Sequence, residues 1–66
     1  MNKATQHRID FLNQQIQHWN QAIDGACYEL RTANEPHAAE LRKDIDAANL
    51  MIRTAQAEIA QLRHDQ

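Results

Sequence analysis

The sequence predicts an all-α fold, an antiparallel two-helix hairpin with coiled-coil-like packing. Two long segments carry hydrophobic residues at alternating steps of three and four, and the only proline lies between them. The chain also contains a single glycine. Strands and tight turns need β-branched runs, glycine and proline, so this composition leaves little material for them. We therefore expect helices throughout.

The first helix is expected over residues 3–33, approximately. Its hydrophobic positions follow the spacing of one face of a coiled-coil helix without a missed step. These positions are Ile9, Leu12, Ile16, Trp19, Ile23, Ala26, Leu30 and Ala33. Gly25 costs about 1 kcal/mol in a helix interior, but the spacing keeps its phase across it. We expect a continuous helix, with Gly25 marking the close approach of another backbone.

The chain reversal is expected at residues 34–36 and the second helix over residues 37–64, approximately. Asn34 suits a left-handed helix C-cap, whereas Pro36 disfavours a helical Glu35 and suits the first turn of a new helix. The second segment repeats the spacing with Ala38, Leu41, Ile45, Ala48, Ile52, Ala55, Ile59 and Leu62. So short a connection makes the two helices antiparallel.

The two hydrophobic seams also predict the register of the hairpin. Folding between residues 35 and 36 pairs residues whose numbers add to 71, so that Ile9 meets Leu62 and Ile16 meets Ala55. Central layers combine a large residue with an alanine, which lets the helices approach closely at native packing density. Residues 1–66 are expected to form this single helical-hairpin domain.

The two sides of such a hairpin differ in polarity. The polar face carries Gln6, Asn13, Asn20, Cys27, Arg42, Asn49, Gln56 and Arg63. The apolar face carries Phe11, His18, Ala22, Gly25, Ala47, Leu50, Met51 and Thr54. An exposed apolar patch on a small chain marks a protein contact, and 66 residues build only a small core. We expect a homodimer in which two hairpins form a four-helix bundle.

The sequence points to no catalytic, metal or cofactor site. No two of the four histidines are spaced to ligate one metal from a single helix. His7 and His64 meet at the open end but occupy outward positions. Cys27, the only cysteine, lacks a neighbouring histidine with an orienting carboxylate. We expect no enzymatic activity, no cofactor, no bound metal and no intrachain disulfide.

Residues near the turn are candidates for contacts with a partner protein. Tyr28 is predicted to point outward, and an exposed tyrosine suits a protein interface. Glu29, Glu40 and Asp44 gather negative charge that suits a basic partner surface. Stabilisation of the helix dipole by Glu40 is the alternative account of this charge.

These features favour a non-enzymatic adaptor or inhibitor that homodimerises and binds another protein. The whole chain serves to present one binding surface, as in compact regulators of host proteins encoded by phages or mobile elements. One alternative is a dimer that binds structured RNA or an anionic nucleotide through Arg8, Lys43 and Arg53. Another is a structural coiled-coil piece of a larger assembly.

The net charge and the hydropathy of the chain bear on its partners and on its location in the cell. Seven Lys and Arg residues against nine Asp and Glu residues give a net charge of -2, which disfavours nucleic acid as a partner. No apolar run approaches the roughly 18 residues of a membrane span, and no export signal is recognisable. We expect a cytoplasmic protein without a membrane segment.

Overall fold

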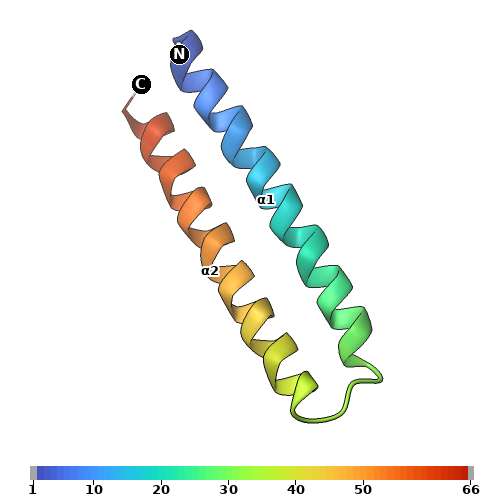
Figure 1. Cartoon of the computed structure of the whole chain (residues 1–66). Helices are drawn as coiled ribbons and strands as arrows, with labels where there is room; N and C mark the ends of the chain where they lie inside the picture. Colours follow the sequence, from blue (N-terminus) through green and yellow to red (C-terminus); the bar gives the residue numbers. More distant parts are fainter. Residues whose placement is uncertain (1, 66) are drawn as a thin grey trace.

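The chain forms two antiparallel α-helices joined by a short connection (Figure 1). The computed structural model describes residues 2–65, and residues 1 and 66 of the predicted domain lie outside this range. Helix α1 spans Lys3–Leu30 and helix α2 spans His37–His64. The Cα atoms extend over 49 × 14 × 11 Å. The predicted all-α hairpin is therefore confirmed.

The core is the seam between the two helices. A buried cluster near the open end comprises Ile9, Leu12, Ala55 and Ile59, with Ile16 and Leu62 packed against it. These residues are the ones that the predicted register brings together in three adjacent layers. All the predicted seam positions of both helices are buried or half-buried. The hydrophobic spacing therefore identified the core correctly.

Helix α1 begins with a side-chain cap and continues through its glycine. The Asn2 Oδ1 atom accepts a hydrogen bond of 2.7 Å from the backbone N–H of Thr5, which satisfies one free donor of the first turn. The prediction that α1 runs unbroken through Gly25 is confirmed. Within the hairpin nothing approaches Gly25 closely, because a Cβ added there would meet no described atom within 4 Å apart from its chain neighbours and the backbone of its own helix.

Helix α1 ends at Leu30, earlier than the predicted end at residue 33. The backbone N–H groups of Arg31 and Thr32 donate to carbonyls three residues earlier, at 3.3 Å each. Such bonds belong to a tighter, 3₁₀-like turn that closes a helix. Thr32 is also a weak helix former. Ala33 consequently lies in the connection, where it is still half-buried.

The left-handed cap predicted at Asn34 is wrong. No non-glycine residue within residues 2–65 has a positive φ. The Asn34 carbonyl instead accepts a hydrogen bond of 3.0 Å from the N–H of Ala38, and the Glu35 carboxylate accepts one of 3.1 Å from the N–H of Ala39. Both residues therefore cap the start of α2 and not the end of α1. The Glu35–Pro36 peptide bond is cis.

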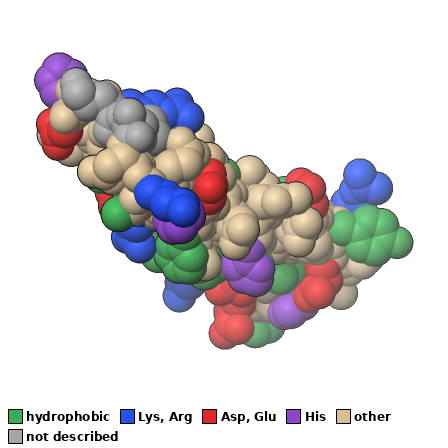
Figure 2. Space-filling view, turned by 90° about the horizontal axis from the view of Figure 1, so that it is seen from above, with side chains coloured by type: hydrophobic (Ala, Val, Ile, Leu, Met, Phe, Trp, Pro, Cys, Tyr) green, Lys and Arg blue, Asp and Glu red, His purple; other side chains and the backbone are tan. Residues whose placement is uncertain are grey.

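The two sides of the hairpin have different surfaces. In Figure 2 the upper side is mostly tan, whereas hydrophobic, acidic and histidine side chains gather along the lower side. Four large hydrophobic residues are exposed, Phe11 by 47%, Leu50 by 57%, Met51 by 47% and Tyr28 by 73%. Over residues 2–65, neither helix combines the length and apolarity needed to cross a membrane.

Candidate protein interface

The apolar face is hollowed between the two helices towards the open end. This first hollow has a volume of about 270 Å³. Its lining includes Phe11, Trp19, Met51, Thr54, Arg8 and Glu58. Three of these residues were predicted for the apolar face, so the structure brings them together across α1 and α2.

Arg8 and Glu58 link the two helices beside this hollow. The Arg8 Nε atom donates to Glu58 Oε2 at 2.7 Å, and its Nη2 atom donates to Oε1 at 3.0 Å. Two parallel hydrogen bonds of this kind fix the guanidinium plane. The guanidinium carbon lies 5.3 Å from the centroid of the Phe11 ring, within range of a cation–π contact. Arg8 thus holds an exposed phenyl ring in place.

Two ion pairs between side chains lower the pKa values of their carboxylates. Hydrogen bonding from Arg8 lowers the pKa of Glu58 from its usual 4.5. Partial desolvation raises this pKa, and Coulomb attraction to Arg8 lowers it further. Hydrogen bonding from Arg42 lowers the pKa of Glu35 in the same way. Both carboxylates are therefore harder to protonate in the folded hairpin than in the unfolded chain.

Acid should destabilise the hairpin through these two carboxylates. Their pKa values are lower when folded, so the unfolded chain binds more protons as the pH falls. The stability they provide is present above pH 4.5 and is lost as the pH falls through their folded pKa values. Urea unfolding of dilute protein at several pH values measures this loss. Replacing both by glutamine (E35Q/E58Q) should flatten it, whereas E40Q should not; equal slopes for both would contradict the expectation.

A second hollow continues the apolar face towards the turn. Its volume is about 320 Å³. Its lining includes Trp19, Ala22, Ala26, Asp44, Ala47 and Ala48. Leu50 lies one helical turn from Ala47, and Gly25 lies one turn from Ala22, so both extend the same face.

Trp19 lines both hollows, in addition to occupying its predicted position in the seam. Its side chain is half-buried, and its ring packs edge-on against His18 with centroids 5.4 Å apart. The neighbouring Ala22 and Ala48 are too small to cover an indole ring, so part of it stays accessible without any opening of the seam. This mismatch in size is the sequence signal that identifies Trp19 as a surface residue.

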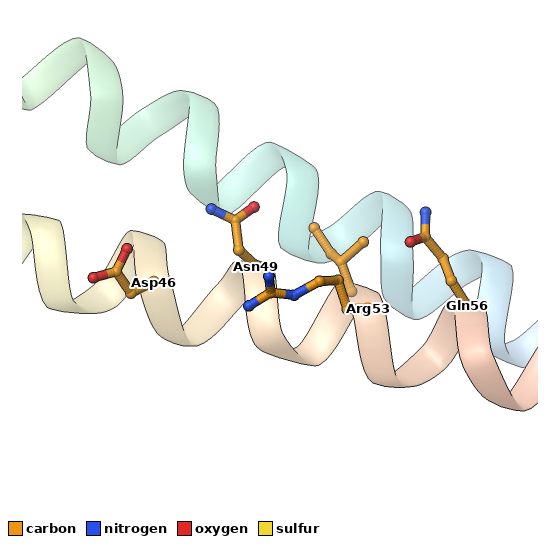
Figure 3. Close-up of a pocket in the computed structure, with 5 residues that line it drawn as sticks. Asp46, Asn49, Arg53 and Gln56 are labelled. Carbon is orange, nitrogen blue, oxygen red and sulfur yellow. The ribbon is translucent and has the colours of Figure 1, made fainter.

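The polar face carries a hollow of about 430 Å³. It is lined by Asp46, Asn49, Ile52, Arg53 and Gln56, all from α2 (Figure 3). The amides of Asn49 and Gln56 point towards α1, while the Arg53 side chain runs along α2. A lining from one helix with exposed amides suits solvent more than a shaped ligand.

The cations proposed for RNA binding do not converge. Arg53 lines the hollow of the polar face, whereas Arg8 lines a hollow of the apolar face and is occupied by Glu58. Lys43 is exposed and lines neither of these hollows. A phosphate-binding surface needs such charges on one side, so this arrangement weighs against nucleic acid.

The acidic residues near the turn are only partly free. Glu29 is hydrogen-bonded to His37, which was not predicted. Within residues 2–65, the side-chain carboxylates of Glu40 and Asp44 have no hydrogen-bond or ion-pair partner, although the Glu40 backbone N–H donates to the Pro36 carbonyl. Tyr28 is exposed, with the Arg31 guanidinium carbon 5.7 Å from its ring centroid. Tyr28, Glu40 and Asp44 therefore remain as the accessible candidates for partner contacts at the turn end.

The residues that the structure describes include no cluster of metal-binding side chains. In the described chain, from residue 2 to residue 65, no three His, Cys, Asp or Glu side chains gather where they would hold an ion. His7 and His64 are both exposed.

Comparisons with protein-family models, curated proteins and solved structures find no match to this chain. The function of this chain is therefore inferred from the geometry of its apolar face.

Proposed function

We propose that this chain is a non-enzymatic helical adaptor or inhibitor that homodimerises through its apolar face and binds a partner protein near its turn. The exposure of Phe11, Leu50 and Met51 beside two hollows carries the proposal. Water contact with such side chains is unfavourable by about 25 cal/mol per Å² of apolar surface. A contiguous patch of this kind is typical of a protein contact.

The surface area of the isolated hairpin supports a second copy as the occupant of this face. The chain exposes 5056 Å². A compact monomer of 7.6 kDa is expected to expose about 4,300 Å². The excess is therefore roughly 750 Å², close to the ~800 Å² that each partner contributes to a stable protein interface.

The shape and spacing of the apolar face suit a four-helix bundle. The face runs along a hairpin whose Cα atoms extend 49 Å by 14 Å, a footprint of roughly 700 Å². On α1, Phe11, His18, Ala22 and Gly25 are separated by seven, four and three residues. On α2, Ala47, Leu50, Met51 and Thr54 lie at positions i, i+3, i+4 and i+7. This is the spacing of a second seam, on which another helix packs at a small crossing angle.

The turn end is the surface that we assign to the partner protein. Tyr28 offers an exposed, amphipathic ring, and Glu40 offers an unpaired carboxylate at the start of α2. A tyrosine and a carboxylate at the same end of the hairpin suit a surface that combines an apolar pocket with a basic residue. Binding of such a partner, and not catalysis, is the activity that we propose.

The response of self-association to salt tests this proposal. Contact between apolar faces should persist, or strengthen slightly, from about 0.05 M to about 0.5 M salt, because screening reduces repulsion between two acidic chains. Sedimentation equilibrium across this range measures the dissociation constant of the dimer. A probe of structured RNA in the same buffers should show no binding. Tight RNA binding that falls steeply with salt would favour the nucleic-acid alternative instead.

A further inference from the structure

We infer that the second copy lies antiparallel on the apolar face, with the turn end of each hairpin against the open end of the other. This inference rests on the proposed homodimer and adds its orientation. Two symmetric arrangements bring the apolar faces together. In one the two turns lie at the same end, and in the other they lie at opposite ends. Charge and shape both select the second.

The charges of the apolar side are unevenly distributed along the hairpin. Towards the turn it carries Glu29, Glu40 and Asp44, of which only Glu29 has a partner, His37. Towards the open end, Glu58 is matched by Arg8. An arrangement with both turns together would gather six carboxylates at one end of the bundle, which is unfavourable. The antiparallel arrangement separates the two acidic ends.

Shape complementarity points to the same orientation. In an antiparallel dimer, α1 packs against the partner's α1 with its direction reversed. Reversal about the midpoint of α1, between residues 16 and 17, brings Phe11 opposite Ala22 of the partner subunit. Reversal about His18, about 2 Å further along at 1.5 Å per residue, brings it opposite Gly25 of the partner subunit. Either position sets the exposed ring on a small residue.

The space at Gly25 then has an occupant. Apart from its chain neighbours and the backbone of its own helix, no described atom lies within 4 Å of a Cβ built there, and Ala22 borders the second hollow. A phenyl ring from the second copy would fill this space, repeating the pairing of large and small residues in the hairpin's own seam. In the register in which paired residue numbers add to 71, the same axis crosses α2 between residues 53 and 55, so Met51 lies within about one helical turn of it.

This orientation has a functional consequence. The two turn ends, each with Tyr28 and Glu40, lie at opposite ends of a bundle about as long as one hairpin, 49 Å. Two partner proteins, or two copies of a site on a symmetric partner, can then be bound at once. The dimer is therefore built as a bivalent linker, whose avidity depends on the spacing of the partner's sites.

A mixing experiment tests the orientation. The variant F11A removes the ring, and the variant A22L/G25L fills the small positions that would receive it. All three positions are exposed in the hairpin, so each variant should fold, which circular dichroism checks. Each variant alone should dimerise about tenfold or more weakly than the parent chain, through a void or a clash. An equimolar mixture should form heterodimers, because each ring then faces a small residue and each filled position faces Ala at 11.

Native mass spectrometry of the mixture gives the proportions. We expect heterodimers well above the statistical half of all dimers. If the parent chain dimerises but the mixture gives only the statistical proportion, the antiparallel orientation is wrong and the homodimer stands. If the parent chain is monomeric, the proposed homodimer itself fails.

Disulfide trapping provides a second readout that needs no destabilising change. In a C27S background, H18C should form a linked dimer on mild oxidation, because the antiparallel arrangement places the two residues 18 near the symmetry axis. N20C in the same background, on the polar face of α1, should not. Equal trapping of both, or of neither, would overturn the orientation.

Discussion

Replacing Leu50 and Met51 by glutamate should leave the hairpin helical but convert the dimer into a monomer. Both side chains are about half exposed, so their replacement removes little from the core of the hairpin. In the dimer they lie at the middle of the interface, where four buried carboxylates without partners would cost several kcal/mol in total. The mass measured by light scattering should fall from 15.2 kDa, twice the chain mass of 7.6 kDa, to 7.6 kDa.

A charge-matched variant separates the interface from the net charge. Q17E/Q56E also adds two negative charges, but both positions lie away from the apolar face. It should keep the mass of the dimer, and circular dichroism should show equal helix content in both variants. An unchanged mass for L50E/M51E would place the interface elsewhere, and a loss of mass in both variants would show that charge alone separates the copies.

Truncating Ile9 to alanine should have the largest effect on folding. Its side chain is only 2% exposed and belongs to the buried cluster at the open end. Large-to-small changes at such sites typically cost about 2–5 kcal/mol. A chain of 66 residues is expected to have a total stability of only about 3–10 kcal/mol. Urea unfolding followed by circular dichroism should therefore show a much lower midpoint, or no folded baseline.

Ile23 is the matched control for this experiment. It occupies an equivalent position in the seam of α1 but is only half-buried. The same Ile-to-Ala change should therefore cost less at residue 23 than at residue 9. Equal losses at both positions would show that the core extends evenly along the seam, or that another copy buries Ile23.

The core of the fold was predictable because hydrophobic spacing reports the buried side of a helix directly. The steps of three and four identified every seam residue, and the large and small layers gave the register around Ile9 and Ile59. Gly25 was correctly predicted to continue α1, since the spacing keeps its phase across it. Its predicted close neighbour does not lie among residues 2–65 of the same hairpin, and the approach of a backbone from a second copy stays a prediction.

The connection was less predictable because several hydrogen-bonding patterns compete over a few residues. Asn34 suits a left-handed cap in general, but here its carbonyl caps α2 and its φ is not positive. The end of α1 at Leu30 depends on backbone bonds of a tighter turn, which no side-chain pattern specifies. Such choices depend on local geometry that differs by small energies.

The candidate interface was predictable in its residues but not in its detailed shape. Phe11, Met51 and Thr54 were placed on one face by spacing alone, and the structure assembles them around a hollow. The pairing of Arg8 with Glu58 was missed, because long side chains reach across more than one layer. The accessibility of Trp19 was missed because covering it depends on the volume of its neighbours and not on its position in the repeat.

The mass of the unmodified chain in solution is the sharpest test of dimerisation through the apolar face. Sedimentation equilibrium at micromolar concentration should give 15.2 kDa, twice 7.6 kDa, with dissociation on dilution and little weakening by salt. A mass of 7.6 kDa at every concentration up to the solubility limit would contradict the claim that a second copy covers the apolar face.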